Sequence, residues 1–353
     1  MERRYCINEI IHTTKAILMN RPKNIRIDNF LEIIFKKYNS MLLLVNCDDI
    51  SSIIEEVSFV EQRILESIND YFNGRLMGAL VEIQRLNDNI GKKLKVTTLK
   101  EGEIWYRGRI KEQSVGLYEK NEMFHIPDSM RERVSNQRFS FNGYPCLYLG
   151  KSIWDCWEEL DEPQLENVCF SALKITKELC LLDLSMPSEK CIYSDNCNEV
   201  VELLITFPLI LACSIKVQDE KANFKSEYII PQLLMNNLIN YHKFDGYLFS
   251  STKQNTLLEW DDNYLNNVVL PVNGDFDNSG LSNKLKQCVS MTEPICYKYE
   301  FLKSTVSNLS SFTEKYIDNL LSDKGWDKTR DLYSKSLFGQ MEMVLKRKEF
   351  TQI

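Results

Sequence analysis

The distribution of glycine constrains this chain more than any other feature of its sequence. Glycine does not occur before Gly74, and apolar residues recur at helical spacing through the same stretch. One stripe of this kind consists of Ile53, Ile54, Val57, Val60, Ile64 and Ile68. Apolar residues at this period predict helices that each bury one face in a core. We therefore expect residues 1–95 to form a helical N-terminal domain with this stripe in its interior.

The sequence changes character near residue 96, where proline, glycine and aromatic residues become frequent. Strands are predicted at 96–98, 103–107, 146–149, 172–183, 246–249 and 267–271. Helices are predicted at 152–160, with Ser152 as the N-cap, and at 228–240, with Pro231 in the first turn. This mixture of strands and helices predicts an α+β domain over residues 96–273.

Residues 274–353 begin with a turn-rich stretch and then become helical again. The run 273–280 is rich in glycine, asparagine and aspartate, which favour turns. Further on, 311–314 has the S-x-x-E form of a capping box ahead of apolar residues at helical spacing. We expect this part to be a linker followed by a helical C-terminal segment.

The composition of the chain indicates which kinds of partner it can bind and in which cellular compartment it functions. The net charge of −7 argues against a nucleic-acid partner, because binding to phosphates needs basic surface. The eleven cysteines occur singly, without a CxxC pair, which favours a reducing cytosol over a zinc site or a disulfide framework. The longest apolar run, 203–213, is too short to span a bilayer, and the N-terminus lacks the apolar region of a signal peptide. We therefore expect a cytoplasmic protein that does not enter a membrane.

Several common catalytic signatures are missing from the sequence. It contains no phosphate loop, no dinucleotide-binding glycine fingerprint and no HExxH motif. The three histidines, His12, His125 and His242, are too widely spaced to predict a metal cluster or a catalytic triad. We expect His125 to be a packed or capping residue rather than a base, and we expect no bound metal.

The remaining candidates for chemistry lie in a series of short segments in the middle domain. In chain order these are 105–109, 136–139, 143–150, 157–160, 227–232 and 244–253. Taken singly, each is more typical of a strand edge, a solvated helix face or a turn than of a site. Their joint order and spacing carry the information.

That order resembles the RES domain, a bacterial family of ADP-ribosyltransferase-like toxins named for its arginine, glutamate and serine. The resemblance covers residues from about 100 to 273, about half the chain, and implies an ADP-ribosyltransferase-like fold flanked by helical N- and C-terminal segments. Arg107 matches the family arginine. Glu159, which follows Tyr148 by eleven residues (159 − 148), matches the glutamate, and the adjacent Glu158 is the alternative.

The match continues in two further segments. Ser251 matches the family serine, with Ser250 as the adjacent alternative, and Arg138 matches the arginine of the family's glycine-Arg-aromatic segment. The chain departs from the family pattern at 136–137, where glycine is frequent, at Gly150, where alanine is usual, and at Ser250, where proline is common.

The resemblance implies that NAD⁺ is the substrate and that the nicotinamide–ribose bond is cleaved without a cofactor. Positive charge develops on the ribose in such a reaction, and the carboxylate of Glu159 would stabilise it. Guanidinium groups bind phosphate bidentately, which suits Arg107 and Arg138 to the pyrophosphate. Tyr148 would hold the nicotinamide ring, and Ser251 would bind a ribose or phosphate oxygen.

The residues leave the acceptor of the ADP-ribosyl group open. Phosphate or water would make the chain an NAD⁺ phosphorylase or an NAD⁺ glycohydrolase, and a protein acceptor would make it an ADP-ribosyltransferase. A third alternative, from another class, is a non-catalytic interaction or scaffold protein. The resemblance also implies a small antitoxin as a partner, and the helical N-terminal domain could dimerise, restrain the enzyme or sense a trigger.

Overall fold

The computed structural model describes residues 2–45, 49–111, 117–187, 197–241, 244–253, 266–297, 333 and 336–353. These residues form two compact units, each assembled from several stretches of chain. Unit 1 comprises Met1–Thr97, Val134–Tyr144 and Cys180–Thr252, and unit 2 comprises Thr98–Arg133, Pro145–Leu179 and Lys253–Ile353. The units therefore interleave along the chain, whereas the domains expected from the sequence are consecutive. Both helices and strands are present, so the fold is of the mixed α+β class.

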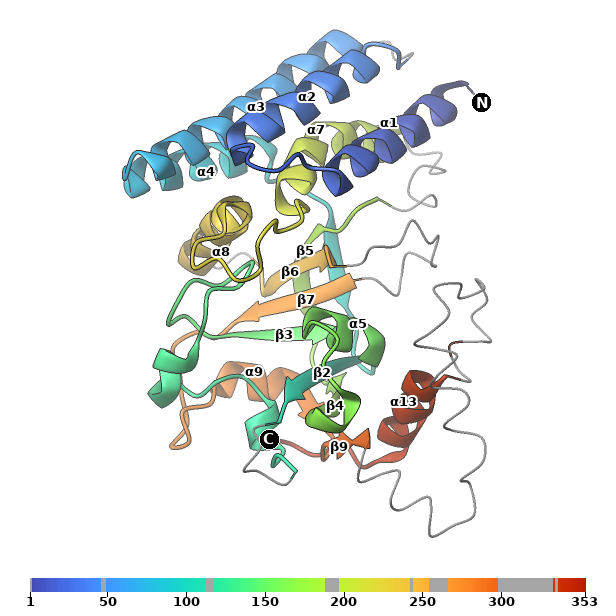
Figure 1. Cartoon of the computed structure of the whole chain (residues 1–353), viewed down its shortest axis with the longest axis vertical. Coiled ribbons are helices and arrows are strands. Elements are labelled where there is room, and N and C mark those ends of the chain that lie inside the picture. The colour runs from blue at the N-terminus through green and yellow to red at the C-terminus, as the bar shows by residue number, and fades with distance from the viewer. Residues whose placement is uncertain are drawn as a thin grey trace. The chain divides into compact units, whose positions relative to one another are not determined.

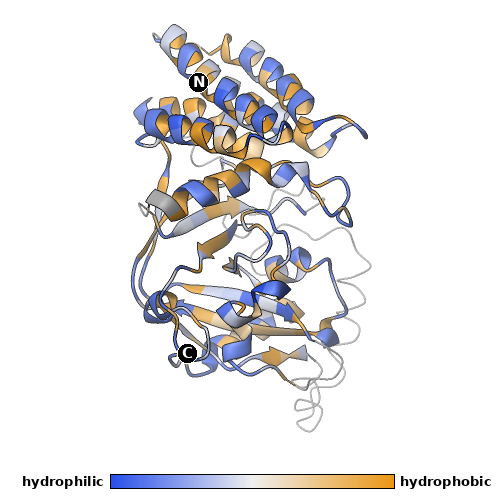
Figure 2. Cartoon of the chain, turned by 90° about the vertical axis from the view of Figure 1, so that its left-hand side faces the viewer, coloured by the Kyte–Doolittle hydropathy of each residue, from blue (hydrophilic) through white to orange (hydrophobic). Residues whose placement is uncertain are grey.

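The N-terminal part of unit 1 is helical, as the sequence predicts. Its helices are α1 (Glu2–Met19), α2 (Ile27–Leu42), α3 (Ile50–Phe72) and α4 (Leu76–Ile90) (Figure 1). The predicted apolar stripe lies on α3, where its members are buried except for the half-buried Ile54. The colouring in Figure 2 shows the same alternation of polar and apolar residues along these helices. Helical periodicity alone therefore identified the buried face of α3.

The rest of unit 1 consists of helices and a pair of parallel strands. Its elements are β5 (Leu179–Leu184), α7 (Cys197–Cys213), η4 (Ser226–Tyr228), α8 (Ile229–Tyr241) and β6 (Gly246–Ser250), with β1 (Val96–Leu99) at its boundary. Strands β5 and β6 are parallel neighbours, and their register runs from the pair Leu181–Gly246 to the pair Leu184–Phe249. Parallel neighbours need a long crossover connection, and α7 and α8 lie in the intervening chain.

The apolar run 203–213 lies in α7 and packs inside unit 1. Its side chains are buried in the core, as Leu204 and Phe207 show with exposed fractions of 3% and 1%. The hydroxyl of Tyr38 on α2 donates to the Leu204 carbonyl at 2.6 Å, and its ring lies 5.5 Å from that of Phe207. Among the helices of the described residues, none is both long and apolar enough to cross a membrane.

A buried carboxyl group joins α2 to α3. Glu61 is 8% exposed, and one of its oxygens accepts a hydrogen bond from the Asn39 amide at 2.9 Å. Its other oxygen and the Asn39 amide oxygen are both buried without a partner within the described residues. Burial raises the pKa of Glu61 to about 7, and the bond from Asn39 opposes that rise. A proton on Glu61 would supply the donor that these two acceptors lack.

We expect the change Glu61→Gln to stabilise the protein at pH 8 by about 2 kcal/mol. The pKa of Glu61 is raised from 4.5 to about 7 in the folded protein. Its contribution to the free energy of unfolding is therefore fully present below pH 4.5 and is lost as the pH rises through 7, because the buried carboxyl must then give up its proton. Glutamine keeps the shape, does not titrate and can donate to Asn39. Urea unfolding of both proteins at pH 5 and pH 8 measures the effect. Glu55→Gln, on the exposed side of α3, is the control, and equal pH dependence in wild type and Glu61→Gln would contradict this account.

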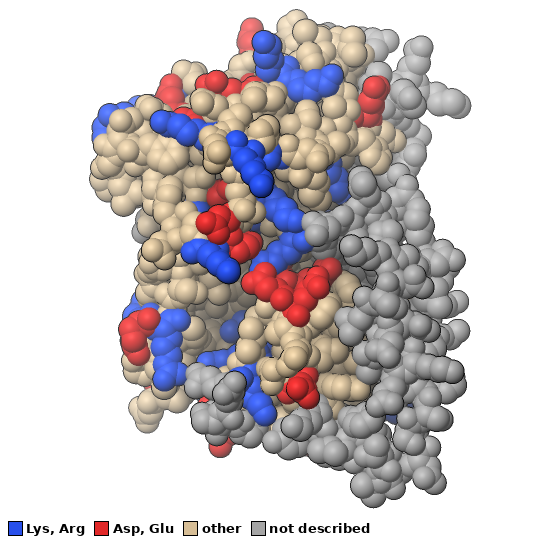
Figure 3. Space-filling model, viewed as in Figure 1, with Lys and Arg blue, Asp and Glu red and all other residues tan. Residues whose placement is uncertain are grey.

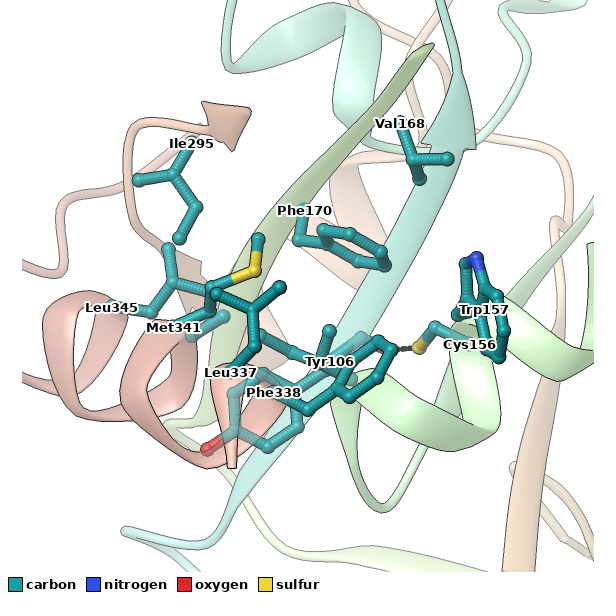
Figure 4. Packing of buried hydrophobic residues seen from close by; sticks show 12 residues of the cluster. Tyr106, Cys156, Trp157, Val168, Phe170, Ile295, Leu337, Phe338, Met341 and Leu345 are labelled. Carbon is teal, nitrogen blue, oxygen red and sulfur yellow. Dashed lines mark hydrogen bonds between the residues drawn. The ribbon is translucent and has the colours of Figure 1, made fainter. Parts of the chain in front are cut away.

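Unit 2 contains an antiparallel sheet with the strand order β7-β3-β2-β4-β8, and β9 also pairs with β4. The strands are β2 (Ile104–Ile110), β3 (Cys146–Gly150), β4 (Val168–Ile175), β7 (Asn266–Pro271), β8 (Val289–Met291) and β9 (Ile295–Cys296). The helical elements are η1 (Asn121–Met123), η2 (Asp128–Arg133), α5 (Ile153–Glu159), η3 (Leu165–Asn167), α9 (Asn283–Cys288) and α13 (Leu337–Arg347). Figure 4 shows the core in which α5 and α13 pack against β2 and β4.

Two expectations about secondary structure need correction. The single strand predicted at 172–183 is two strands, β4 and β5, separated by a turn at 176–178. The segment expected to be only linker and helix contains β8 and β9, which extend the sheet beside β4. Strands of three and two residues are too short to show an alternating pattern. The helix predicted after 311–314 lies outside the described residues.

Candidate functional site

The residues predicted to act on NAD⁺ are distributed over both units. Arg107, Tyr148 and Glu159 belong to unit 2, and Arg138 and Ser251 belong to unit 1. The two groups are therefore described separately.

Arg107 lies on β2 where this strand separates from β3. Strand β2 pairs with β4 along its whole length, but its register with β3 comprises only Tyr106 and Gly150. Beyond that pair, the Arg107 guanidinium donates to the main-chain carbonyl of Tyr148 on β3 at 3.0 Å. A side chain thus binds a strand carbonyl at the point where the ladder between the two strands ends.

The surroundings of Arg107 are unusual for a structural arginine. Burial, and to a smaller extent the neighbouring positive charge of Arg109, lower the pKa of Arg107 to about 10, so it stays charged at neutral pH. Its Nε atom is buried and makes no hydrogen bond within the described part of the chain. A buried donor without a partner costs about 1–3 kcal/mol. A half-buried cation with an unused donor is well suited to an anionic ligand.

Glu159 is the last residue of the short helix α5. Ser152 caps this helix, since its hydroxyl accepts from the Asp155 amide while the Asp155 carboxylate accepts from the Ser152 amide, each at 3.0 Å. The predicted N-cap is therefore confirmed. Helix α5 lies so close to the end of β3 that a Cβ atom at Gly150 would be 2.9 Å from the Cys156 sulfur and 3.1 Å from the Ser152 carbonyl oxygen. This close approach favours glycine at position 150, because any side chain there would crowd the start of α5.

Two residues hold Glu159 in place from other parts of unit 2. The side-chain amide of Asn267 on β7 donates to the Glu159 carboxylate at 2.8 Å, and Asn267 is 4% exposed. The ammonium group of Lys253 donates to the Glu159 main-chain carbonyl at 2.8 Å and pairs with Asp161 at 2.6 Å. Sequence reasoning missed Asn267, although a pair of amides at the start of an apolar strand is a usable signal. The neighbouring Glu158 is also half-buried.

The strand register decides which side chains share a face of the sheet. Asn267 pairs with Gly150 on β3, so Asn267 lies on the same face as Tyr148, two residues before Gly150. Glu159, which Asn267 binds, adjoins this face. Tyr106 pairs with Gly150, so the side chain of Tyr106 is on this face and that of the next residue, Arg107, is on the opposite face. Arg107 contacts β3 through the hydrogen bond to the Tyr148 main-chain carbonyl. The fold thus brings Tyr148 and Glu159 to one face of the sheet. Arg107 contacts the strand that carries Tyr148.

In unit 1, Arg138 is buried and binds the protein's own main chain. Its guanidinium donates to the carbonyls of Cys213 and Ile215 at 3.0 and 3.1 Å and to the Thr252 hydroxyl. Arg138 therefore fixes the segment that follows β6, and its expected contact with NAD⁺ stays a prediction. Ser251 lies in that segment and is half-buried.

The alternative serine, Ser250, ends β6. Its hydroxyl accepts a hydrogen bond from the Met186 amide at 3.0 Å, so it has a structural role in unit 1. The choice between Ser251 and Ser250 as the functional serine stays a prediction.

His125 is a packed residue, as the sequence predicts. It is fully buried, its Nε2 accepts from the Ser282 amide at 2.9 Å, and its Nδ1 lies 2.8 Å from the Ile126 carbonyl. These partners assign the proton to Nδ1. Burial lowers the pKa of His125 to about 4, so the ring is neutral at physiological pH; Nε2 binds the residue that precedes α9, and Nδ1 binds the neighbouring main chain.

Neither the groups of potential metal ligands nor the distribution of surface charge points to a further binding site among the described residues. Within the described ranges, no group of three or more His, Cys, Asp or Glu side chains could hold a metal ion. On the face shown in Figure 3, basic and acidic side chains lie next to one another. The described residues on that face therefore do not form the continuous basic surface that is typical of nucleic-acid binding.

Comparison with known proteins gives one informative match. The chain is 29% identical over 298 residues to a protein of Bacillus subtilis (strain 168) named "Putative toxin YopC". The match covers 77% of this chain and 66% of that protein, so the chain spans less than two thirds of the length of this relative. No protein-family model and no solved structure matches the chain.

Proposed function

We propose that this protein is a toxin that destroys NAD⁺ by cleaving its nicotinamide–ribose bond, with a RES-type, ADP-ribosyltransferase-like catalytic domain. The observation that carries the proposal is the placement of Glu159. Its carboxylate is held by the buried amide of Asn267 on the face of the sheet that also bears Tyr148. The similarity to a protein named as a toxin supports the toxic role.

The proposed reaction needs one fixed negative charge near the ribose. The bonding electrons of the C–N bond leave with nicotinamide, which departs neutral because it starts as a pyridinium cation, so no general acid is required. The ribose becomes oxocarbenium-like, and Glu159 stabilises that positive charge. Tyr148 stacks on the nicotinamide ring, and Arg107 binds the pyrophosphate with its charged fork. Arg138 and Ser251 keep the roles that the family resemblance implies.

The oxocarbenium carbon is then attacked by an acceptor, which decides the class of enzyme. Phosphate gives ADP-ribose 1″-phosphate, water gives ADP-ribose and a protein side chain gives an ADP-ribosylated protein, and in each case the attacking group loses a proton. We favour phosphate or water, with the protein acceptor as the alternative. Incubating the purified chain with NAD⁺ in buffers with and without phosphate, and then with a bacterial lysate, distinguishes these products by mass spectrometry. NAD⁺ that stays intact in every arm would overturn the proposal and favour a scaffold role.

The proposed substrate also indicates where and with what the protein acts. NAD⁺ is an abundant cytoplasmic metabolite, so we place the activity in the cytoplasm. An unrestrained NAD⁺-consuming enzyme harms the cell that makes it, so we propose an antitoxin as the protein partner.

We expect Arg107→Lys to lower kcat/KM for NAD⁺ by about 10- to 100-fold, since a charge-assisted hydrogen bond contributes about 1.5–3 kcal/mol. Lysine keeps the positive charge, but its donors all lie on one nitrogen atom, so it loses the planar fork that can bind the Tyr148 carbonyl through one nitrogen and phosphate oxygens through the others. Initial-rate kinetics measure the loss. Arg109→Lys, two residues further along β2, is the matched control because Arg109 binds the main chain of Glu122. Near-normal kinetics for Arg107→Lys would show that Arg107 is structural.

A further inference from the structure

The C-terminal helix α13 packs directly on the helix that ends in Glu159. Ser336 caps α13 by accepting from the Gly339 amide at 3.1 Å. The buried side chains that α13 contributes to the core of unit 2 are Leu337, Phe338, Met341 and Leu345. Figure 4 shows them facing Tyr106, Phe170 and Trp157. The Phe338 ring lies 5.4 Å from that of Trp157 on α5, so the two helices share one apolar core.

A buried carboxylate on α13 also binds the first turn of α5. Glu342 is 7% exposed, and one of its oxygens accepts from the Ile153 main-chain amide at 3.1 Å and from the Tyr333 hydroxyl at 2.6 Å. Its other oxygen lies 3.4 Å from the Lys346 ammonium. Ile153 is the first residue of α5, and the amides at the start of a helix have no partner within the helix itself. A negative charge at this end also interacts favourably with the helix dipole.

We propose that Glu342 is a positioning residue for Glu159, an inference that rests on the proposed function. Helix α5 has only seven residues, and helices of that length are not stable without external contacts. Ser152 and Asp155 cap it from within, and Glu342 ties its first amide to α13. Because α5 is short and anchored at its start, a shift there moves its last residue, Glu159. Helix α13 is therefore part of the structure that positions Glu159.

The test compares Glu342→Ala and Glu342→Gln in the full-length chain. Alanine removes the acceptor of the Ile153 amide, whereas the glutamine amide oxygen can still accept that bond. We expect alanine to lower kcat for NAD⁺ by about tenfold with little change in KM, and glutamine to restore most of the activity. Met343→Ala is the matched control, because the next residue of α13 is 43% exposed. All variants are compared well below their unfolding temperatures, with folding checked by circular dichroism.

Amide hydrogen exchange of residues 153–159 gives a readout that does not depend on activity. We expect at least tenfold faster exchange in Glu342→Ala than in wild type, Glu342→Gln or Met343→Ala. Wild-type exchange rates in Glu342→Ala would overturn the anchoring role. Faster exchange with unchanged kcat would overturn the positioning of Glu159. A wild-type protein that leaves NAD⁺ intact would instead overturn the proposed function, and the exchange rates would still decide whether Glu342 anchors α5.

Discussion

Glu159→Gln is expected to lower kcat for NAD⁺ cleavage by about 100- to 1000-fold, the loss typical when one electrostatic contact to a transition state is removed. Glutamine keeps the size of the side chain and can still accept the hydrogen bond from Asn267. What it loses is the negative charge that, in the proposed reaction, stabilises the positive charge developing on the ribose. The measurement is the initial rate of NAD⁺ loss at saturating substrate, with the unfolding midpoint of the variant compared with that of wild type.

The matched control is Glu158→Gln, the adjacent half-buried carboxylate. We expect this variant to keep most of the activity. Loss of activity in Glu158→Gln with full activity in Glu159→Gln would transfer the role by one residue. Full activity in both variants would contradict a catalytic carboxylate at the end of α5.

The second large effect is expected in living cells. Induced expression of the wild-type chain in bacteria without an antitoxin should deplete cellular NAD⁺ and arrest growth, because the NAD⁺ pool is shared by many reactions. Glu159→Gln at the same protein level should leave both growth and NAD⁺ unchanged. Extracted NAD⁺ and optical density are followed together over one culture.

The outcomes in cells also distinguish the alternatives. Growth arrest with NAD⁺ at its normal level would contradict NAD⁺ destruction and favour a transferase that acts on a protein. A folded chain that changes neither growth nor NAD⁺ would favour the scaffold role.

The fold was most predictable where local pattern and length agree. The stripe of α3 repeats over several turns, and most of its members are buried as the period requires. The split between β4 and β5 was missed because 176–178 contains neither glycine nor proline to mark a turn. Strands β8 and β9 were missed because they form by pairing with β4, which lies more than 100 residues earlier in the chain.

The candidate site shows the same limit. The resemblance in the sequence predicts Arg107, Tyr148 and Glu159 as site residues, and the eleven-residue step from Tyr148 to Glu159 is a spacing that one sequence can show. The residues that hold Glu159 come from distant positions, with Asn267 separated from it by 108 residues. Glu342 is 189 residues from the amide that it binds. Contacts at such separations leave no periodic signal in one sequence.

Release of free nicotinamide from NAD⁺ by the purified full-length protein tests the central claim most directly. We predict that nicotinamide accumulates in an amount equal to the NAD⁺ lost, and that Glu159→Gln at the same concentration releases at most about one hundredth as much in the initial phase. A folded wild-type protein that releases no nicotinamide, with or without phosphate, would contradict the account.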